Sequence, residues 1–179
     1  MLAVVKMNMN AQLSSDPQNT SLQKNSQLVD QTVQELRLIS HNLIPEELGL
    51  GLPQGLEALA DKLIITNKLQ IITQIHPDLQ GKKFAKPFEL SVYRIAQEVL
   101  NNMLKHAEAS LINIHLNPTS KGMVLHIFDN GKGFDTKLIN QSNGLGWKNI
   151  KARVSLLSGQ LSVLSEPNNG SSVEIHLPV

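Results

Sequence analysis

The chain has 179 residues, of which 41% are apolar and 17% are charged, and its formal net charge is +1. This balance gives no strong field toward nucleic acid or a membrane surface, and an aromatic content of 3% argues against stacking on nucleic-acid bases. The absence of cysteine excludes disulfides, thiolate metal sites and cysteine nucleophiles, and it fits a cytoplasmic location. No run approaches the roughly 20 apolar residues of a membrane span.

Residues 1–44 predict two helices joined by a turn. Apolar residues recur at three- and four-residue spacing over 1–13, and Asp16-Pro17 interrupts the pattern. A second helix is expected over 21–43, with four residues close to heptad spacing: Val29, Val33, Leu36 and Leu43. The pattern fits a helix packed on a globular domain. We prefer the interpretation that residues 1–44 are part of a helical hairpin that dimerises into a four-helix bundle, because a hairpin with so narrow an apolar seam buries too little apolar surface alone.

Residues 45–53 (PEELGLGLP) predict a connector and the domain boundary, because Gly and Pro interrupt periodic structure. The domain 54–179 should contain alternating elements: helices at 54–63, 87–108 and 145–157, and strands at 69–75, 111–116, 123–128, 161–164 and 172–177. Helices interleaved with hairpin-like strand pairs predict an α+β fold, a two-layer α/β sandwich on a mixed sheet.

The helix expected at 87–108 carries the first candidate site. Its core face is predicted from helical spacing: Val92, Ala96, Val99, Met103 and Ala107. Glu98 and Asn102 lie one turn apart on another face, together with Arg94 and Lys105. Such a row suits a Mg²⁺–phosphate group, because hard oxygen ligands hold Mg²⁺ while substrate phosphate completes its shell. Taken alone, the same row is more often a solvated helix face.

Two glycine motifs follow at later points of the chain. In Asp129–Phe134 (DNGKGF), Gly131 and Gly133 permit positive φ or a close backbone approach to a ligand, and Asp129 can accept a hydrogen bond from an amine such as that of adenine. Gly144-Leu145-Gly146-Trp147 opens the next helix, where unpaired N–H groups and the helix dipole favour phosphate. Each motif alone also fits a surface turn or a plain helix start. Three in this order predict a nucleotide site.

These segments resemble the motifs of sensor histidine kinases. NNMLKHA is similar to their N-box, DNGKGFD to the first glycine box, GLGWKNIKAR to the second, and GSSVEIHLP to the closing strand. The resemblance covers roughly residues 43–179. RIAQEVLNNMLKHAEAS and SHNLIPEELGLGLPQGLEAL resemble the nitrate-sensor kind, which pairs with helix-turn-helix response regulators. The implied fold is the Bergerat (GHKL) ATP-binding sandwich, shared with type II topoisomerases and mismatch-repair ATPases.

The resemblance implies roles for the helix residues in binding ATP and Mg²⁺. Asn102 would coordinate the Mg²⁺ that bridges the phosphates. Glu98 would order that shell or polarise the attacking group. Lys105 would contact phosphate, and His106 would line the site.

It also implies roles for the glycine motifs. Asp129 would bind the adenine amino group, and Gly131 and Gly133 would shape the base pocket. Gly144-Leu145-Gly146 would let a lid and the helix start close on phosphate. Ser171 stands where the family often has threonine, in the nucleotide pocket.

The histidines do not follow the family pattern. The phosphoacceptor of the family is a His followed by Asp near the start of the first hairpin helix, and this sequence has no such pair. If residues 1–13 end that helix, the acceptor would lie upstream, and the chain should bind ATP without phosphorylating itself. His41 lies too near the N-box to be the acceptor, so we expect a hairpin-exit residue.

Three strand histidines and one tryptophan leave alternatives open. His115, His126 and His176 alternate with apolar residues, which predicts an exposed sheet face, or a zinc site if their strands are neighbours. Trp147 is expected either to cover a lid or to pack on the core.

The activity implied by the resemblance is transfer of the γ-phosphoryl of ATP to a hairpin His, then to an Asp of a response regulator. The implied partners are ATP, a response regulator and a second copy through the hairpin, without direct nucleic-acid or membrane contact. Two alternatives remain. One is an ATPase of the same fold that uses Glu98 to activate water. The other is a non-catalytic docking module.

Overall fold

The computed structural model divides the chain into two units, Met1–Ile44 and Pro45–Val179, and describes residues 12, 19–26, 28–29, 45–67, 69–136 and 145–179. In the first unit, residues 20–26 and 28–29 are helical. The Leu22 N–H donates to Asn19 Oδ1 at 3.1 Å, an N-cap that starts this helix. The remainder of the expected hairpin, including Asp16-Pro17 and His41, lies outside the described residues.

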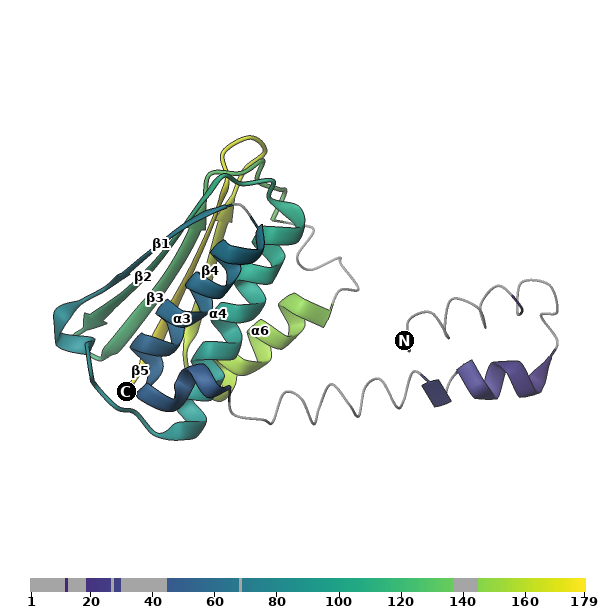
Figure 1. Ribbon diagram of the computed structural model, residues 1–179, viewed down its shortest axis with the longest axis horizontal. Helices are drawn as coiled ribbons and strands as arrows, with labels where there is room; N and C mark the ends of the chain where they lie inside the picture. The colour runs from purple at the N-terminus through teal and green to yellow at the C-terminus, as the bar shows by residue number, and fades with distance from the viewer. Residues whose placement is uncertain (1–11, 13–18, 27, 30–44, 68, 137–144) are drawn as a thin grey trace. The chain divides into compact units, whose positions relative to one another are not determined.

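The second unit is a mixed five-stranded sheet with helices on one face (Figure 1). Its elements in chain order are η1 (Glu46–Leu50), α3 (Leu52–Asn67), β1 (Gln70–Ile75), η2 (Pro77–Leu79), α4 (Lys86–His106), β2 (Leu111–Thr119), β3 (Gly122–Asp129), α6 (Leu145–Leu156), β4 (Gln160–Ser165) and β5 (Ser171–Pro178). The strand order is β1-β2-β3-β5-β4, with β1 parallel to β2 and the other pairs antiparallel. The predicted two-layer α+β sandwich on a mixed sheet is confirmed.

The core lies between the sheet and the three helices α3, α4 and α6. Alternate residues of the central strands, such as Ile114 and Leu125, are 0% exposed and face the helices. The predicted core face of α4 is confirmed, because all five of its residues are buried: Val92, Ala96, Val99, Met103 and Ala107. Each fully buried Val, Leu, Ile or Met side chain in this core stabilises the fold by about 1.5–3 kcal/mol. The core therefore fixes α4 rigidly on the sheet.

Local interactions explain where α4 begins, and pairing with β3 explains where β2 ends. Pro87 stands in the first turn of α4, and the buried Glu89 side chain accepts a hydrogen bond from the Phe84 N–H at 3.0 Å. Strand β2 continues to Thr119, three residues beyond the predicted end, because residues 117–119 pair with the start of β3. The antiparallel ladder carries the strand through Pro118, which stands opposite Met123.

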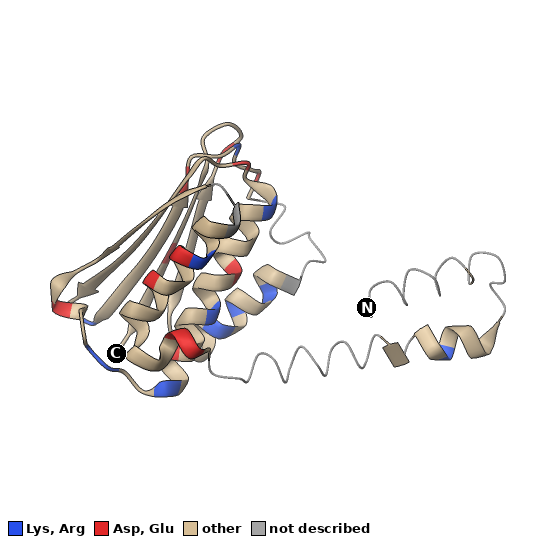
Figure 2. Ribbon diagram, in the orientation of Figure 1, with Lys and Arg blue, Asp and Glu red and all other residues tan. Residues whose placement is uncertain are grey.

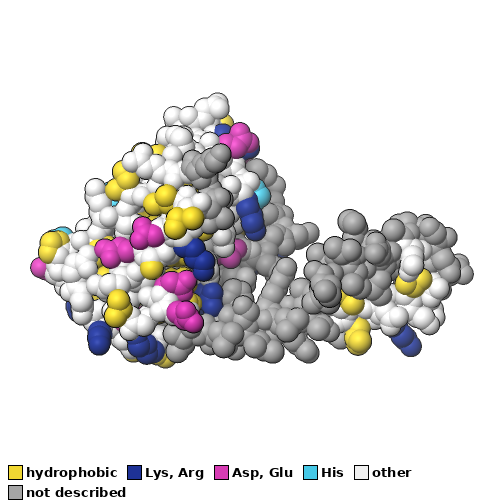
Figure 3. All heavy atoms as spheres, in the orientation of Figure 1, with side chains coloured by type: hydrophobic (Ala, Val, Ile, Leu, Met, Phe, Trp, Pro, Cys, Tyr) yellow, Lys and Arg dark blue, Asp and Glu magenta, His cyan; other side chains and the backbone are white. Residues whose placement is uncertain are grey.

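The segment expected as a connector, residues 45–53, holds η1 and the start of α3. Leu48 within η1 is 1% exposed and belongs to the hydrophobic core. On the face of this unit seen in Figure 3, hydrophobic side chains are separated by polar and charged ones. None of the described helices is long and apolar enough to cross a membrane.

Candidate functional site

Asp129 ends β3 with its carboxylate fixed from two sides. The strand register places it opposite Ser171 of β5, and the Ser171 hydroxyl donates to Asp129 Oδ2. The Gly131 N–H donates to Asp129 Oδ1 at 2.7 Å, and Asp129 is 7% exposed. A carboxylate oxygen can accept more than one hydrogen bond, so this carboxylate retains acceptor capacity for an amino group. The structure thus brings together two residues predicted for the site, 42 positions apart.

The glycine loop after Asp129 is held between the end of α4 and the β4–β5 turn. On one side, the Lys132 N–H donates to Ala107 O at 2.8 Å. On the other, the Gly170 N–H donates to Gly131 O at 2.8 Å and the Asn168 N–H donates to Lys132 O at 2.6 Å. Because backbone groups make these bonds, the loop is positioned by the fold itself.

Gly131 and Gly133 are required by crowding within the protein. A Cβ on Gly131 would lie 2.2 Å from Ala107 O. Gly133 has φ of +60°, and its Cβ would lie 2.0 Å from Glu166 O. Both glycines therefore permit a close backbone approach, and Gly133 also has the positive φ that the sequence indicated. The atoms approached here belong to the protein's own backbone.

Asn130 is a site residue that the sequence analysis missed. Its Oδ1 accepts hydrogen bonds from the Ser110 and Leu111 N–H groups, both at 3.0 Å, and its Nδ2 donates to Ser110 Oγ at 2.9 Å. These bonds tie the residue after Asp129 to the start of β2. A turn sequence such as DNG is the available signal, because Asn side chains bond backbone groups in turns.

The second half of the site lies where α6 begins against α4. A Cβ on Gly146 would lie 2.6 Å from Glu98 Oε1 and 3.4 Å from Asn102 Oδ1. Asn102 Nδ2 is buried and has no hydrogen-bond partner within the described residues. Leu145 is described by its backbone as the first residue of α6, and Gly144 lies outside the described residues. The structure therefore places Gly146 of the second glycine motif against Glu98 and Asn102 of α4.

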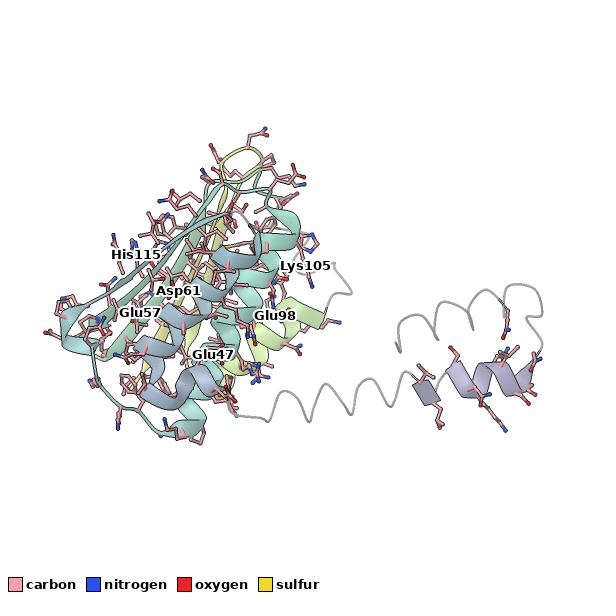
Figure 4. All side chains as sticks on the ribbon, viewed as in Figure 1. Glu47, Glu57, Asp61, Glu98, Lys105 and His115 are labelled. Carbon is pink, nitrogen blue, oxygen red and sulfur yellow. The ribbon has the colours of Figure 1, made fainter. Side chains whose placement is uncertain are left out.

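The other residues of the predicted row differ in their surroundings. Lys105 and His106 stand in the last turn of α4 with exposed side chains, one turn beyond Asn102. Lys105 is labelled in Figure 4. Arg94 is half-buried and donates to Gln97 Oε1 at 2.6 Å. Burial lowers the pKa of Arg94, and the nearby positive charge of Arg153 lowers it further. The row thus splits into an exposed end at Lys105 and an enclosed end at Arg94.

Helix α6, whose start lies against Glu98 and Asn102, contributes positive charge to the site. The helix carries no acidic side chain (Figure 2), and its basic residues are Lys148, Lys151 and Arg153. Lys148 and Lys151 are exposed. Because the N-terminal end of a helix also has a positive partial charge, the start of α6 favours an anion.

Trp147 connects the two glycine motifs. Its ring centroid lies 6.3 Å from that of Phe134 with an interplanar angle of 44°. This is the separation of a favourable aromatic pair. Trp147 is also partly buried against the hydrophobic core. The residue therefore packs on the core and contacts the first glycine loop.

The strand histidines lie on the sheet face opposite the helices. His115 and His126 stand opposite each other on β2 and β3, with ring centroids 6.2 Å apart. His126 Nε2 and Ser172 Oγ are hydrogen-bonded at 2.8 Å, and His176 pairs with Glu174 at 2.7 Å. Burial, with the neighbouring His126, lowers the pKa of His115. No group of three His, Cys, Asp or Glu in the described part of the chain could hold a metal ion.

The chain is similar to a known protein family and to several named proteins. The family model described as "Histidine kinase-, DNA gyrase B-, and HSP90-like ATPase" matches residues 88–179. The chain is 31% identical over 165 residues to the sensor histidine kinase LiaS of Bacillus subtilis (strain 168), covering 84% of this chain and 44% of LiaS. It is 34% identical over 100 residues to the signal transduction histidine-protein kinase/phosphatase DegS of Brevibacillus brevis, covering 56% of this chain and 26% of DegS. The chain thus spans less than half of either relative.

Solved structures share the fold. The histidine kinase domain of the Erythrobacter litoralis EL346 blue-light-activated histidine kinase has a TM-score of 0.63 at 18% identity, covering 99% of this chain and 85% of that one. The Acinetobacter baumannii histidine kinase AdeS has a TM-score of 0.61 at 14% identity, covering 99% of this chain and 95% of that one. The family match spans both halves of the site described above. The chain belongs to the family of histidine kinase-, DNA gyrase B- and HSP90-like ATPases, whose model matches it over residues 88–179.

Proposed function

We propose that the chain is the catalytic part of a sensor histidine kinase, which transfers the γ-phosphoryl of ATP to a histidine and then to an aspartate of a response regulator. The observation that carries the proposal is that one helix, α4, contacts both glycine motifs. Ala107 O holds the Asp129 loop, and Asn102 and Glu98 face Gly146. These positions lie about 8 to 14 Å apart along the helix, the length scale of a nucleoside triphosphate.

The Asp129 end of the site is proposed to bind the base. Asp129 would accept a hydrogen bond from the adenine amino group, because Ser171 and Gly131 already orient its two oxygens. Ser171 would stabilise that orientation, and Gly131 and Gly133 would shape the loop beside the base. A carboxylate accepts hydrogen bonds only, so it selects an amine at this position over a carbonyl.

The Asn102 end is proposed to bind the phosphates with Mg²⁺. The residues suit a Mg²⁺–phosphate group, because Asn102 Oδ1 is an oxygen of the kind that Mg²⁺ takes. Asn102 Nδ2 is a buried donor without a partner in the described part of the chain, which suits a phosphate oxygen, and Gly146 has no side chain to crowd Glu98. Asn102 Oδ1 would be the protein ligand, with Glu98 ordering the shell, and bound Mg²⁺ would neutralise phosphate charge. Lys105 would contact phosphate from the exposed end of α4, and His106 would line the site. The motif Gly144-Leu145-Gly146 would present backbone N–H groups to phosphate.

Phosphoryl transfer needs positioning more than covalent chemistry from the protein. The rigid core holds α4, so the base end and the phosphate end keep a fixed separation. The positive start of α6 would stabilise charge on the transferred group. Glu98 would then orient or polarise the attacking imidazole of the acceptor histidine.

The parent protein is proposed to follow the relatives in its organisation. LiaS is named a sensor histidine kinase and DegS a histidine-protein kinase/phosphatase. We propose that residues 1–44 belong to a dimerising hairpin, with residues 45–53 leading into the catalytic domain of 54–179. The proposed partner is a response regulator with a helix-turn-helix output domain, and the proposed location of this unit is the cytoplasm, where ATP is present.

A second candidate is an ATPase that uses Glu98 to activate water. It is favoured by the exposed approach at Lys105 and by the carboxylate of Glu98 one turn from Asn102. The two functions differ in the acceptor of the phosphoryl group, which is an imidazole in one and water in the other.

One experiment separates them. The chain is incubated with radiolabelled ATP, Mg²⁺ and a separate hairpin polypeptide that carries the His-Asp pair, and label is followed on the hairpin and in free phosphate. The kinase proposal predicts acid-labile label on the hairpin histidine, absent when that histidine is replaced by alanine. Release of free phosphate at the same rate with or without the hairpin, and lost in Glu98→Gln, would favour the ATPase.

A further inference from the structure

Ser165, the last residue of β4, joins two segments that are distant in sequence. Its Oγ accepts a hydrogen bond from the Phe134 N–H at 2.9 Å and donates one to Gly170 O at 2.8 Å. Ser165 is half-buried, and the strand register places it opposite Ser171. One hydroxyl group therefore fixes the exit of the first glycine loop against the start of β5.

The bond to Gly170 reaches the base end of the site. The Gly170 N–H donates to Gly131 O at 2.8 Å, and a Cβ on Gly170 would lie 2.1 Å from Asp129 O. Gly170 also precedes Ser171, whose hydroxyl holds the Asp129 carboxylate. A shift of Gly170 would therefore move the backbone on which both Asp129 and Ser171 depend.

The bond to Phe134 reaches the phosphate end. The Phe134 ring packs against Trp147 with centroids 6.3 Å apart. Trp147 follows Gly146, which faces Glu98 and Asn102. One aromatic contact therefore links Phe134 to the start of α6.

We infer that Ser165 is a positioning residue that couples the base end of the nucleotide site to its phosphate end through Phe134 and Trp147. The inference rests on the proposed nucleotide binding and adds the residue that aligns its two halves. A hydroxyl suits this position because it donates and accepts at the same time. Alanine would leave the Phe134 N–H and Gly170 O without this partner.

The test compares Ser165→Ala with two matched variants. Ser165→Thr keeps the hydroxyl and suits a strand, and Ser162→Ala removes an exposed hydroxyl from the same strand. The sequence contains one tryptophan, so intrinsic fluorescence reports the surroundings of Trp147. Each protein is titrated with Mg-ADP by calorimetry and by fluorescence, and its thermal unfolding is recorded without nucleotide.

We expect wild type and Ser162→Ala to bind Mg-ADP equally and to show the same change in Trp147 fluorescence. Ser165→Ala should bind about tenfold more weakly and lose most of the fluorescence change at saturation, whereas Ser165→Thr should stay within about threefold of wild type. Wild-type behaviour of Ser165→Ala would overturn the inference. Equal impairment of the alanine and threonine variants would also overturn it.

A further variant decides the matter if Ser165→Ala does not fold. Phe134→Leu keeps the N–H group that Ser165 binds and removes the aromatic contact with Trp147. It should fold, bind Mg-ADP and lose the fluorescence change, and an unchanged response would overturn the coupling. Absence of Mg-ADP binding by folded wild type would instead refute the proposed function on which the inference rests.

Discussion

Alanine at position 146 tests whether the start of α6 closes on the phosphate end of the site. The added Cβ would lie 2.6 Å from Glu98 Oε1, whereas ordinary contact begins at 3.4 Å. The Glu98 carboxylate must therefore retreat by about 0.8 Å, the difference between these distances. Asn102 Oδ1 would be 3.4 Å from the same methyl group, at the limit of ordinary contact, so only the Glu98 side chain has to move.

The expected effect of Gly146→Ala on the free energy of unfolding is small. A side chain forced off its rotamer by about 30° costs about 0.5–1.5 kcal/mol. Replacing glycine by alanine inside a helix returns up to about 1 kcal/mol, because the unfolded chain loses conformational freedom. The free energy of unfolding should therefore change by less than about 1 kcal/mol. Binding and chemistry should respond more, because misplacement of a site group by about 1 Å can cost about 100-fold in rate.

The assay compares Gly146→Ala with Gly49→Ala, a control glycine with no atom within 4 Å of its added Cβ. Thermal unfolding and Mg-ATP-analogue binding are measured on both, and phosphotransfer to a supplied hairpin is timed. We expect native-like unfolding for both variants and loss of transfer by about 100-fold for Gly146→Ala alone. Normal transfer by Gly146→Ala would refute the placement of Glu98 at the reaction. A large loss of stability would refute the packing argument.

Three further predictions concern the fold around the site. Gly133→Ala combines φ of +60° with a Cβ 2.0 Å from Glu166 O, so it should destabilise the domain by about 3 kcal/mol or more in denaturant unfolding, and a loss below about 1 kcal/mol would contradict the geometry. Glu89→Ala deprives Lys86 Nζ and the Phe84 N–H of a buried acceptor and should cost about 2 kcal/mol, whereas unchanged stability would show that the bonds are dispensable. The pKa of His115 is lowered in the folded protein, so below about pH 6.5 the unfolded chain binds more protons at this residue than the folded protein does. The free energy of unfolding therefore keeps its full value above about pH 6.5 and decreases as pH falls. His115→Gln should therefore flatten the decrease of melting temperature between about pH 7 and 5, and an unchanged slope would contradict the assignment.

Much of the fold could be predicted from periodicity. The core face of α4 was predicted because apolar residues recur at helical spacing, and the burial of Val92 and Val99 confirms it. The strand order could not be predicted, because period-two alternation identifies a strand without naming its neighbours. The extension of β2 through Pro118 likewise depends on pairing with β3, which the local sequence does not encode.

The site was predicted in part for the same physical reason. The proposed binding residues can be recognised by their residue type and local spacing, as Glu98 and Asn102 can along one helix. Contacts between distant segments have no such signal. Ser171 meets Asp129 through the β3–β5 register, and Gly146 meets Glu98 through helix packing. Ser165 was missed because a serine at a strand end has no distinctive pattern.

The most direct test of the central claim is calorimetric titration of a non-hydrolysable ATP analogue with Mg²⁺ into wild type and Asp129→Asn. The substitution keeps the size of the side chain and replaces one acceptor oxygen by a donor amide. Hydrogen bonds to charged groups contribute about 1.5–3 kcal/mol, so we predict binding by wild type and affinity at least about tenfold weaker in Asp129→Asn. Equal affinity of the two folded proteins would contradict the placement of the base at Asp129, and absence of binding by folded wild type would contradict the proposed ATP-dependent function.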